Sequence, residues 1–250
     1  MKKIAIIAAL LLLGAAGQTL LALRRPVSSP LAAEGVMAAL GGFRSLAAEA
    51  VWFRAEALQE EGRYVELAQL AKTLSLLEPH TPEVWSYAAW NLAYNISVMM
   101  PTLEDRWRWV HAGLRLLRDE GLRLNPDSAE LHRELAWMFE VKIGADIDEA
   151  APIYREKWRE IVADVASRGA WGEIAMDPAG MEELAKLFGI SDWTSPQASA
   201  IYWASRGLAR SPSPSDAAFL RNILRHSLWI LDTGVVHTPP QNHGASEGGV

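Results

Sequence analysis

The chain has 250 residues, of which 50% are hydrophobic and 22% are charged, so it can bury a sizeable core and is not globally disordered. It contains no cysteine, which excludes disulfides, thiolate metal sites and cysteine nucleophiles. The formal net charge is −6, and the part of the chain from Glu34 onward carries 20 basic against 30 acidic residues. Because nucleic acid is itself an anion, this acidic body argues against a nucleic-acid partner.

Residues 1–25 form the first predicted element, a signal anchor that crosses a membrane as a helix. The 20 residues from Ile4 to Leu23 carry no charge, and pairs of basic residues flank them. At about 1.5 Å per residue such a helix is about 30 Å long, the thickness of a hydrocarbon core. A cleaved signal peptide is the alternative, with an apolar stretch at 4–13 and small residues at 14–17 as its cleavage site. The apolar residues continue beyond that site, which a signal peptide does not need, and this favours the anchor.

The basic residues also bear on orientation, although they are almost balanced between the two flanks. Lys2, Lys3 and the terminal amine precede the apolar run, and Arg24 and Arg25 follow it. The positive-inside rule then favours an N-terminus in the cytoplasm and a body on the exported, periplasmic side of the membrane. Cleavage would release the same body as a secreted protein.

Residues 26–37 are predicted to be a juxtamembrane linker, and 38–166 to be helical. The linker begins with PVSSP, which favours extended or turn backbone. Beyond the linker, apolar residues recur at steps of three and four, and no stretch alternates as a half-buried strand does. The sequence therefore predicts an all-α protein.

The helical stretches share an order that repeats along the chain. In the stretch WFRAEALQEEGRYVELAQLAKTLSLLEPHTPEVW, a Gly-x-Tyr turn begins at Gly62, and Pro79 closes the unit 17 residues later. Trp85 then opens the next unit. This pattern resembles the tetratricopeptide repeat, in which each unit is a pair of helices. The resemblance implies an α-solenoid of helix-turn-helix pairs over 38–166.

Two further units are predicted after the first. The second ends in Leu-Asn-Pro at Pro126, 47 residues after Pro79, whereas the family period is about 34 residues. An insertion near 99–106, between the two helices of this unit, is expected to absorb the excess. The third unit starts near Ala129 and turns at 144–146.

A second resemblance covers nearly the whole chain. The stretches GGFRSLAAEAVWFRA, AWNLAYNIS, DRWRWV and SDWTSPQASAIYWASRGL are similar to uncharacterised bacterial proteins with a membrane-anchored tetratricopeptide-like region. This resemblance implies a membrane location but no activity.

The C-terminal third departs from the repeat pattern. Residues 167–195 are predicted to be an irregular, glycine-containing insertion with one short helix at 179–187. A helix pair is predicted over 196–231, where Ser195 caps the first helix and a proline occupies its first position. The remaining residues, 232–250, have no apolar period, which predicts a disordered tail.

The repeat resemblance also implies a concave groove, lined by the first helix of each unit, that holds a protein or peptide partner. The register set by Gly62 places seven residues in or beside this groove: Trp52, Glu56, Trp90, Tyr94, Asn95, Arg133 and Trp137. Aromatic side chains beside arginine and glutamate are typical of a peptide-binding lining. The chain has 11 tryptophans, too many for one groove, so packing between repeats as core is the alternative for each of them.

Asn95 lies one helical turn after Asn91, and two roles are open to this amide pair. The side chains can bind the backbone of a peptide, or they can satisfy carbonyl groups of an irregular loop at 96–104. The second role is favoured.

Motifs of catalytic and metal sites are missing from the sequence, which has no HExxH, no GxSxG and no phosphate-binding glycine loop. Asp146, Asp148 and Glu149 can be read as ligands of a hard cation. They also lie at the start of a predicted helix, where carboxylates cap exposed amides and favour the helix dipole. We therefore expect no enzyme activity, no metal and no small-molecule cofactor.

The sequence thus predicts a membrane-anchored, tetratricopeptide-like scaffold that binds a protein or peptide in an aromatic-lined groove. Two alternatives stay open. The protein can be a permanent structural subunit of a cell-envelope or export complex, or an enzyme on a helical solenoid that uses acidic residues such as Asp146 and Asp148.

Overall fold

A computed structural model describes residues 50–235, apart from Trp52 and Glu56. The predicted anchor and linker fall within 1–49 and, like residues 236–250, lie outside the described residues. Within the part that is described, no helix is long and apolar enough to cross a membrane. That part is helical and contains no strand, so the predicted all-α class is confirmed.

The backbone at 53–55 and 57–60 is helical, and the longer helices follow it in the chain. They are α3 (Tyr64–Leu77), α4 (Pro82–Trp90), η1 (Asn91–Ile96), α5 (Leu103–Arg115), η2 (Leu116–Gly121), α6 (Leu122–Leu124), α7 (Ala129–Trp137), η3 (Met138–Ile143), α8 (Ala151–Arg168), η4 (Trp171–Ile174), α9 (Pro178–Phe188), α10 (Pro196–Leu208) and α11 (Pro214–Thr233). The segments η1, η2 and η3 are π-helical, and η4 is a 3-10 turn.

Each π-helical segment directly continues an α-helix. α4 runs on through η1 to Val98, α5 through η2 and α6 to Leu124, and α7 through η3 to Ile143. A π-helical turn closes its hydrogen bonds over five residues instead of four, so it rotates the side chains beyond it relative to those before it. These three helices are therefore longer, and less regular, than the apolar pattern alone indicates.

The expected insertion at 99–106 is wrong. Only residues 99–102 connect the helix that contains α4 to α5, which begins at Leu103. The excess over the repeat period lies in the helices themselves, since the second helix of this pair runs from Leu103 to Leu124 whereas α3 has 14 residues. Local periodicity could not distinguish an extended helix with a π-helical segment from a helix followed by a loop.

Capping residues explain where several of these helices begin. The side chain of Ser128 accepts a hydrogen bond from the amide of Leu131 at 3.2 Å, and Ser195 accepts one from Gln197 at the same distance. α10 consequently begins at Pro196, as the capping serine and the proline after it predict. The short helix expected at 179–187 is α9, which Asp177 caps.

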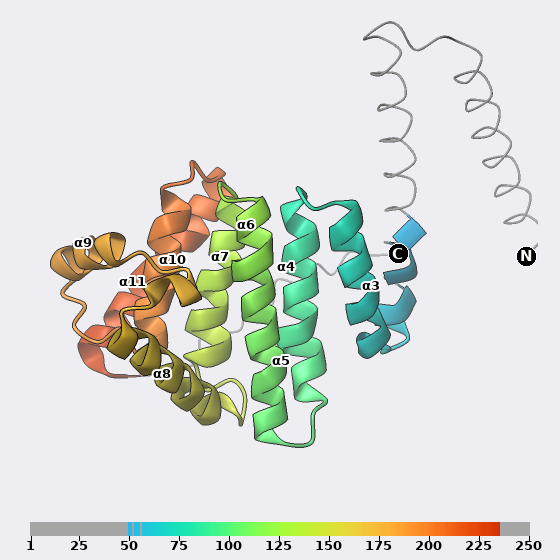
Figure 1. Cartoon of the computed structure of the whole chain (residues 1–250), viewed down its shortest axis with the longest axis horizontal. Helices are drawn as coiled ribbons and strands as arrows, with labels where there is room; N and C mark the ends of the chain where they lie inside the picture. The colour runs from blue at the N-terminus through green and yellow to red at the C-terminus, as the bar shows by residue number, and fades with distance from the viewer. Residues whose placement is uncertain (1–49, 52, 56, 236–250) are drawn as a thin grey trace, which may run out of the picture. The chain divides into compact units, whose positions relative to one another are not determined.

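One hydrophobic core joins the elements from α4 to α11. In Figure 1, α3, α4, α5 and α7 stand side by side as upright helices, and α10 and α11 lie beyond α7. α8 contacts α5 and η3 on another side of the core. The largest fully buried side chains include Trp158, Tyr154, Tyr202 and Phe139. Most of this core comes from residues that are distant in the chain, as expected for packed helices.

Two glycines allow neighbouring helices to pack closely. A Cβ atom at Gly113 in α5 would lie 2.8 Å from the carbonyl oxygen of Ala89 in α4. A Cβ atom at Gly207 in α10 would lie 3.0 Å from side-chain atoms of both His132 and Leu220. Because interiors are close-packed, any side chain at these positions would push the helices apart.

Candidate functional site

Five of the seven residues predicted to line a groove are described, and they lie on two neighbouring helices. Trp90, Tyr94 and Asn95 lie on α4 and η1, and Arg133 and Trp137 lie on α7, which contacts α4. The other two, Trp52 and Glu56, lie outside the described residues. The structure therefore brings the two described groups of residues close together, although their side chains differ in depth.

Trp90 is the most exposed of the predicted tryptophans that the structure describes. Its residue surface is 41% exposed, and its ring stacks on Tyr94 with the ring centroids 5.5 Å apart. Tyr94 lies deeper, because its hydroxyl is buried and has no hydrogen-bond partner among the described residues. Burial, followed by the charge of Glu134, raises the pKa of Tyr94. Trp90 therefore stacks on the more deeply buried Tyr94, and of these two rings Trp90 is the one that a partner can contact.

Asn95 forms its hydrogen bond within its own helix. Its side-chain amide donates to Oδ1 of Asn91 at 3.0 Å, and Asn91 is fully buried. The two amides are thus paired, as their spacing of one helical turn suggests. This contact is neither of the two roles predicted for Asn95, which were binding the backbone of a peptide and satisfying carbonyl groups of the loop at 96–104.

Arg133 and Trp137 contact α11, a helix that the repeat resemblance does not place there. Arg133 forms ion pairs with Glu134 and with Asp216 of α11. The Trp137 ring lies 5.2 Å from the ring of Phe219, also on α11, and the guanidinium of Arg133 lies 5.8 Å from that same ring. α11 therefore packs along the face of α7 that was predicted to line the groove, and it adds its own side chains to that face.

α11 contributes two exposed aromatic rings that sequence reasoning missed. Phe219 and Trp229 are each about as exposed as Trp90. Trp229 stacks on His226 with ring centroids 6.0 Å apart, and His226 in turn contacts Glu140 of η3. The positions of these rings depend on how α11 packs against α7 and η3. No local sequence pattern records that packing.

Carboxylates lie on α4 and α7, the helices that carry Trp90 and Trp137. The Ser86 hydroxyl donates to Oε1 of Glu130 at 2.9 Å, which links the two helices. Burial raises the pKa of Glu130, and the negative charges of Glu83 and Glu134 raise it further. These three carboxylates therefore interact electrostatically. We name the whole surface the aromatic–acidic face and define it by Glu83, Trp90, Glu130, Glu134, Trp137, Phe219 and Trp229.

The acidic residues at 146–149 are held by basic partners. Lys142 Nζ lies 2.7 Å from Oδ2 of Asp148, and both side chains are almost completely buried. The Tyr154 hydroxyl and the Ala150 amide donate to the same carboxylate, at 3.0 and 2.9 Å. Asp146 pairs with Arg155 at 2.7 Å.

The pKa shifts in this buried cluster follow from these contacts. Burial alone would raise the pKa of Asp148, but hydrogen bonds from Lys142 and Ala150 outweigh it and hold that pKa below its usual value. Burial lowers the pKa of Lys142, and Asp148 offsets part of that shift. In the described part of the chain, no three His, Asp or Glu side chains are placed to hold a metal ion. The carboxylate of Asp148 is engaged by Lys142, Tyr154 and the Ala150 amide within the fold.

Glu140 of η3, which is buried, and His226 of α11, which is partly exposed, form a pair of titratable groups. His226 Nδ1 lies 2.7 Å from Oε1 of Glu140. Burial raises the pKa of Glu140 to about 8 and lowers the pKa of His226. Both shifts favour the neutral form of each group at pH 7, and the donor in their hydrogen bond is then either the carboxyl O–H or the imidazole N–H.

This pair predicts that the folded chain loses stability as the pH rises. Between the usual pKa of glutamate, 4.5, and about 8, the folded state binds the Glu140 proton more tightly than the unfolded chain does. The free energy of unfolding should therefore fall by about 2 to 4 kcal/mol across this window. The lowered pKa of His226 acts in the opposite direction below about 6.5, so the loss should be steepest between pH 6.5 and 8.

Urea denaturation of the full chain at pH 5, 6.5 and 8 measures this dependence. Glu140→Gln should flatten it, whereas Glu183→Gln, at an exposed position of α9, should leave it unchanged. An unaltered slope in Glu140→Gln would show that Glu140 is not the group that titrates.

Comparisons with known proteins add no assignment to this geometry. No protein-family model, no curated protein and no solved structure matches the chain.

Proposed function

We propose that the protein is a membrane-anchored, tetratricopeptide-like scaffold that binds a segment of another protein on the aromatic–acidic face and carries out no catalysis. The anchor is the apolar run at 4–23, and the body lies on the exported side of the membrane. The observation that carries the proposal is Trp90, a large aromatic side chain that stays 41% exposed on a helix packed within the body. Exposed indole rings beside polar groups are typical anchors of protein interfaces.

The order of the helices supports a repeat architecture. α4 with η1 is followed by α5 through a short connection, and α7 with η3 is followed by α8. Each first helix also contacts the next one, since α4 contacts α7 and α7 contacts α10. In a solenoid of helix pairs, such contacts between successive first helices form the concave side. The π-helical segments make these units longer than the family period.

The charges of the face indicate the chemistry of the partner. Three carboxylates, Glu83, Glu130 and Glu134, lie on α4 and α7 close enough to interact electrostatically, and Arg133 of α7 is already paired with Glu134 and Asp216. A segment with lysine or arginine among apolar side chains would match this face. Its cations would meet the carboxylates and the indole ring, and its apolar side chains would pack on Phe219 and Trp229.

A permanent structural subunit is the second candidate, and one observation favours it. α11 covers the part of α7 around Arg133 and Trp137, so less of the predicted groove is open to a transient ligand. The rings that α11 exposes would then belong to a lasting interface with another subunit. The rate of dissociation separates the two candidates, since a permanent subunit copurifies with its partner.

Peptide binding tests the proposed function. Three series of short fluorescent peptides are titrated with the full chain: leucine with arginine, leucine with glutamate, and serine with arginine. The leucine–arginine series should bind best, and Trp90→Ala should weaken its affinity about tenfold or more, as expected for an aromatic anchor. Leu187→Ala is the matched control, because Leu187 is an exposed apolar residue on α9.

Two outcomes would contradict the proposed function. The leucine–glutamate series could bind as tightly as the leucine–arginine series, which would remove the role of the carboxylates. Alternatively, Leu187→Ala could weaken binding as much as Trp90→Ala, which would mean that the peptides bind apolar surface without preference for the aromatic–acidic face.

A further inference from the structure

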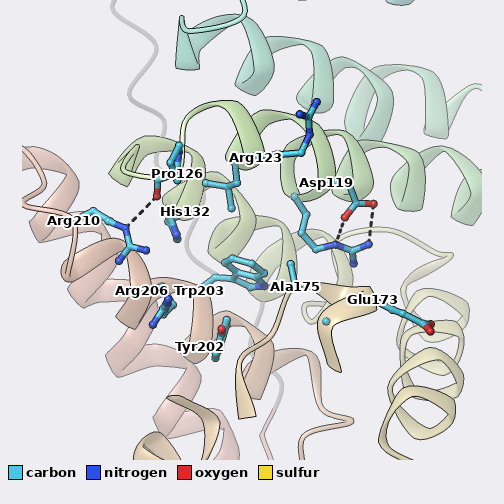
Figure 2. Close-up of a pocket in the computed structure, with 13 residues that line it drawn as sticks. Asp119, Arg123, Pro126, His132, Glu173, Ala175, Tyr202, Trp203, Arg206 and Arg210 are labelled. Atoms are coloured by element: carbon cyan, nitrogen blue, oxygen red, sulfur yellow. Dashed lines mark hydrogen bonds and ion pairs between the residues drawn. The ribbon is translucent and has the colours of Figure 1, made fainter. Parts of the chain in front are cut away.

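A cavity of about 540 Å³ lies among η2, α6, the start of α7, η4 and α10 (Figure 2). Four arginines line it: Arg118, Arg123, Arg206 and Arg210. The aromatic residues in its wall are His132, Tyr202 and Trp203. The cavity is separate from the aromatic–acidic face, because none of the residues that define that face lines it.

The lining is positively charged although the chain as a whole has a net charge of −6. Its only carboxylates are Asp119 and Glu173, so four guanidinium groups face two acids and leave a net charge of +2. Glu173 is moreover held by Arg168, outside the lining, through two contacts of 2.7 Å. The cavity therefore concentrates positive charge, which attracts anions.

His132 does not add to this charge. Burial, together with the charges of Arg210 and Arg206, lowers its pKa to about 4, although the hydrogen bond with Ser128 acts in the opposite direction. Its Nδ1 lies 2.7 Å from the carbonyl oxygen of Ser128, an arrangement that a neutral ring makes by donating its N–H. Because the charges of Arg206 and Arg210 both affect the pKa of His132, both guanidinium groups lie near its ring.

Arg118 brings an unsatisfied donor to this wall. Its side chain is only 5% exposed, and its Nε and Nη2 donate to the two oxygens of Asp119 at 2.6 and 3.1 Å. Its Nη1 is buried and has no hydrogen-bond partner among the described residues. A buried charged donor without an acceptor is unfavourable, so part of the Arg118 charge is not compensated by hydrogen bonds within the fold.

Arg206 and Arg210 form the most available part of the lining. Arg206 lies in the last turn of α10, Arg210 lies in the turn that follows Leu208, and Figure 2 shows both on the opposite side of Trp203 from Asp119. Arg206 makes no hydrogen bond or ion pair with the described residues. Arg210 donates from Nε to the carbonyl oxygen of Pro126 at 3.1 Å and forms an ion pair at 3.5 Å with Asp127, whose side chain is 92% exposed. Guanidinium groups match phosphate oxygens in geometry as well as in charge.

We propose that this cavity binds the phosphate monoester group of a small organic molecule, with the phosphate on Arg206 and Arg210. A phosphate monoester carries close to two negative charges at pH 7, which balances the +2 of the lining. Its three acceptor oxygens can be shared by two adjacent arginines, whereas a dicarboxylate would divide the same charge between two distant groups. The volume is in the range of sites for small organic ligands, so it exceeds the need of phosphate alone.

Calorimetric titration of the full chain tests the proposal. Adenosine monophosphate is the organic probe, inorganic phosphate and succinate are the comparison anions, and phosphatidylcholine vesicles with and without phosphatidic acid probe a lipid source of the same group. Adenosine monophosphate should bind more tightly than either comparison anion. Arg206→Gln should raise its Kd at least tenfold, Arg210→Gln should do the same, and Arg206→Lys should retain part of the affinity.

Arg159→Gln is the matched control, since Arg159 is an exposed arginine of α8 far from the lining residues in the chain. If phosphatidic acid vesicles bind and Arg206→Gln releases them while adenosine monophosphate does not bind, the site keeps its chemistry and its ligand is a lipid headgroup. Absence of binding by both phosphate monoesters would overturn the proposal. Tighter binding of succinate, or an equal loss in Arg159→Gln and Arg206→Gln, would overturn it as well.

Discussion

Replacing Asp148 with alanine should lower the free energy of unfolding by about 3 to 5 kcal/mol, the range for breaking a buried ion pair from one side. Lys142 is buried and reaches Asp148 at 2.7 Å, so the substitution leaves an ammonium group without its counter-charge. Tyr154 and the Ala150 amide lose their acceptor at the same time. Chemical denaturation of the full chain, followed by circular dichroism, measures the loss. A domain of this kind is stable by only about 5 to 15 kcal/mol, so the effect is large.

Asp146→Ala is the matched control for this prediction. Asp146 lies two residues away in the same loop and pairs with Arg155, but its side chain is 57% exposed against 5% for Asp148. Exposed ion pairs contribute about 0 to 1 kcal/mol, so this variant should be nearly as stable as the parent. Equal losses in the two variants would mean that the loop, and not the buried pair, determines the effect.

The same pair has a defined dependence on pH. Because its pKa is held below the usual value in the folded state, Asp148 stabilises the fold at neutral pH. This contribution should be lost only as the pH falls through the folded-state pKa, in the acid range. Asp148→Ala should therefore differ most from the parent at neutral pH and least in acid.

Replacing Trp158 with alanine should destabilise the fold by about 3 to 5 kcal/mol, as large-to-small substitutions of buried tryptophan do. Trp158 is 1% exposed, its ring lies 4.6 Å from that of Phe139, and its indole N–H donates to the Ser199 hydroxyl at 3.1 Å. It therefore joins α8, η3 and α10 at one point of the core. Denaturation curves of the parent and the variant give the difference in the free energy of unfolding.

Trp158→Phe and Trp229→Ala complete this experiment. Trp158→Phe keeps most of the apolar volume but removes the hydrogen bond to Ser199, so its loss should be smaller. Trp229→Ala removes an equally large ring from a position of α11 that is 40% exposed, so its effect should be clearly smaller than that of Trp158→Ala. A loss in Trp229→Ala as large as that in Trp158→Ala would contradict the assignment of these two rings to surface and core.

The two predictions concern the contacts of η3, which continues α7, with α8 and α10. Lys142 of η3 forms the pair with Asp148, and Trp158 contacts the same segment through Phe139. Variants that loosen this region should therefore also disturb the aromatic–acidic face and the arginine-lined cavity. For this reason the binding experiments use substitutions at exposed or half-exposed positions, such as Trp90 and Arg206.

Sequence patterns predicted most of the helices because those patterns are local. Apolar residues at steps of three and four report which face of a helix is buried, and Ser195 with its following proline marks where α10 begins. The same periodicity misplaced the excess length near 99–106, since it does not distinguish a π-helical segment such as η1 from the end of a helix. The five predicted groove residues that the structure describes lie on neighbouring helices, but the sequence did not predict how deeply each of them is buried.

By itself, the sequence determined the helical class of the body, the acidic balance that argues against nucleic acid, and the positions where most helices start. Only the tertiary structure decided that α11 lies along α7, where Arg133 meets Asp216, 83 residues away, and Glu140 meets His226, 86 residues away. It also decided that Arg118 shares a cavity with Arg206 and Arg210. The physical reason is that the pattern of a helix encodes only which of its faces is apolar. The element that covers this face is selected by packing between distant segments, which no local pattern records.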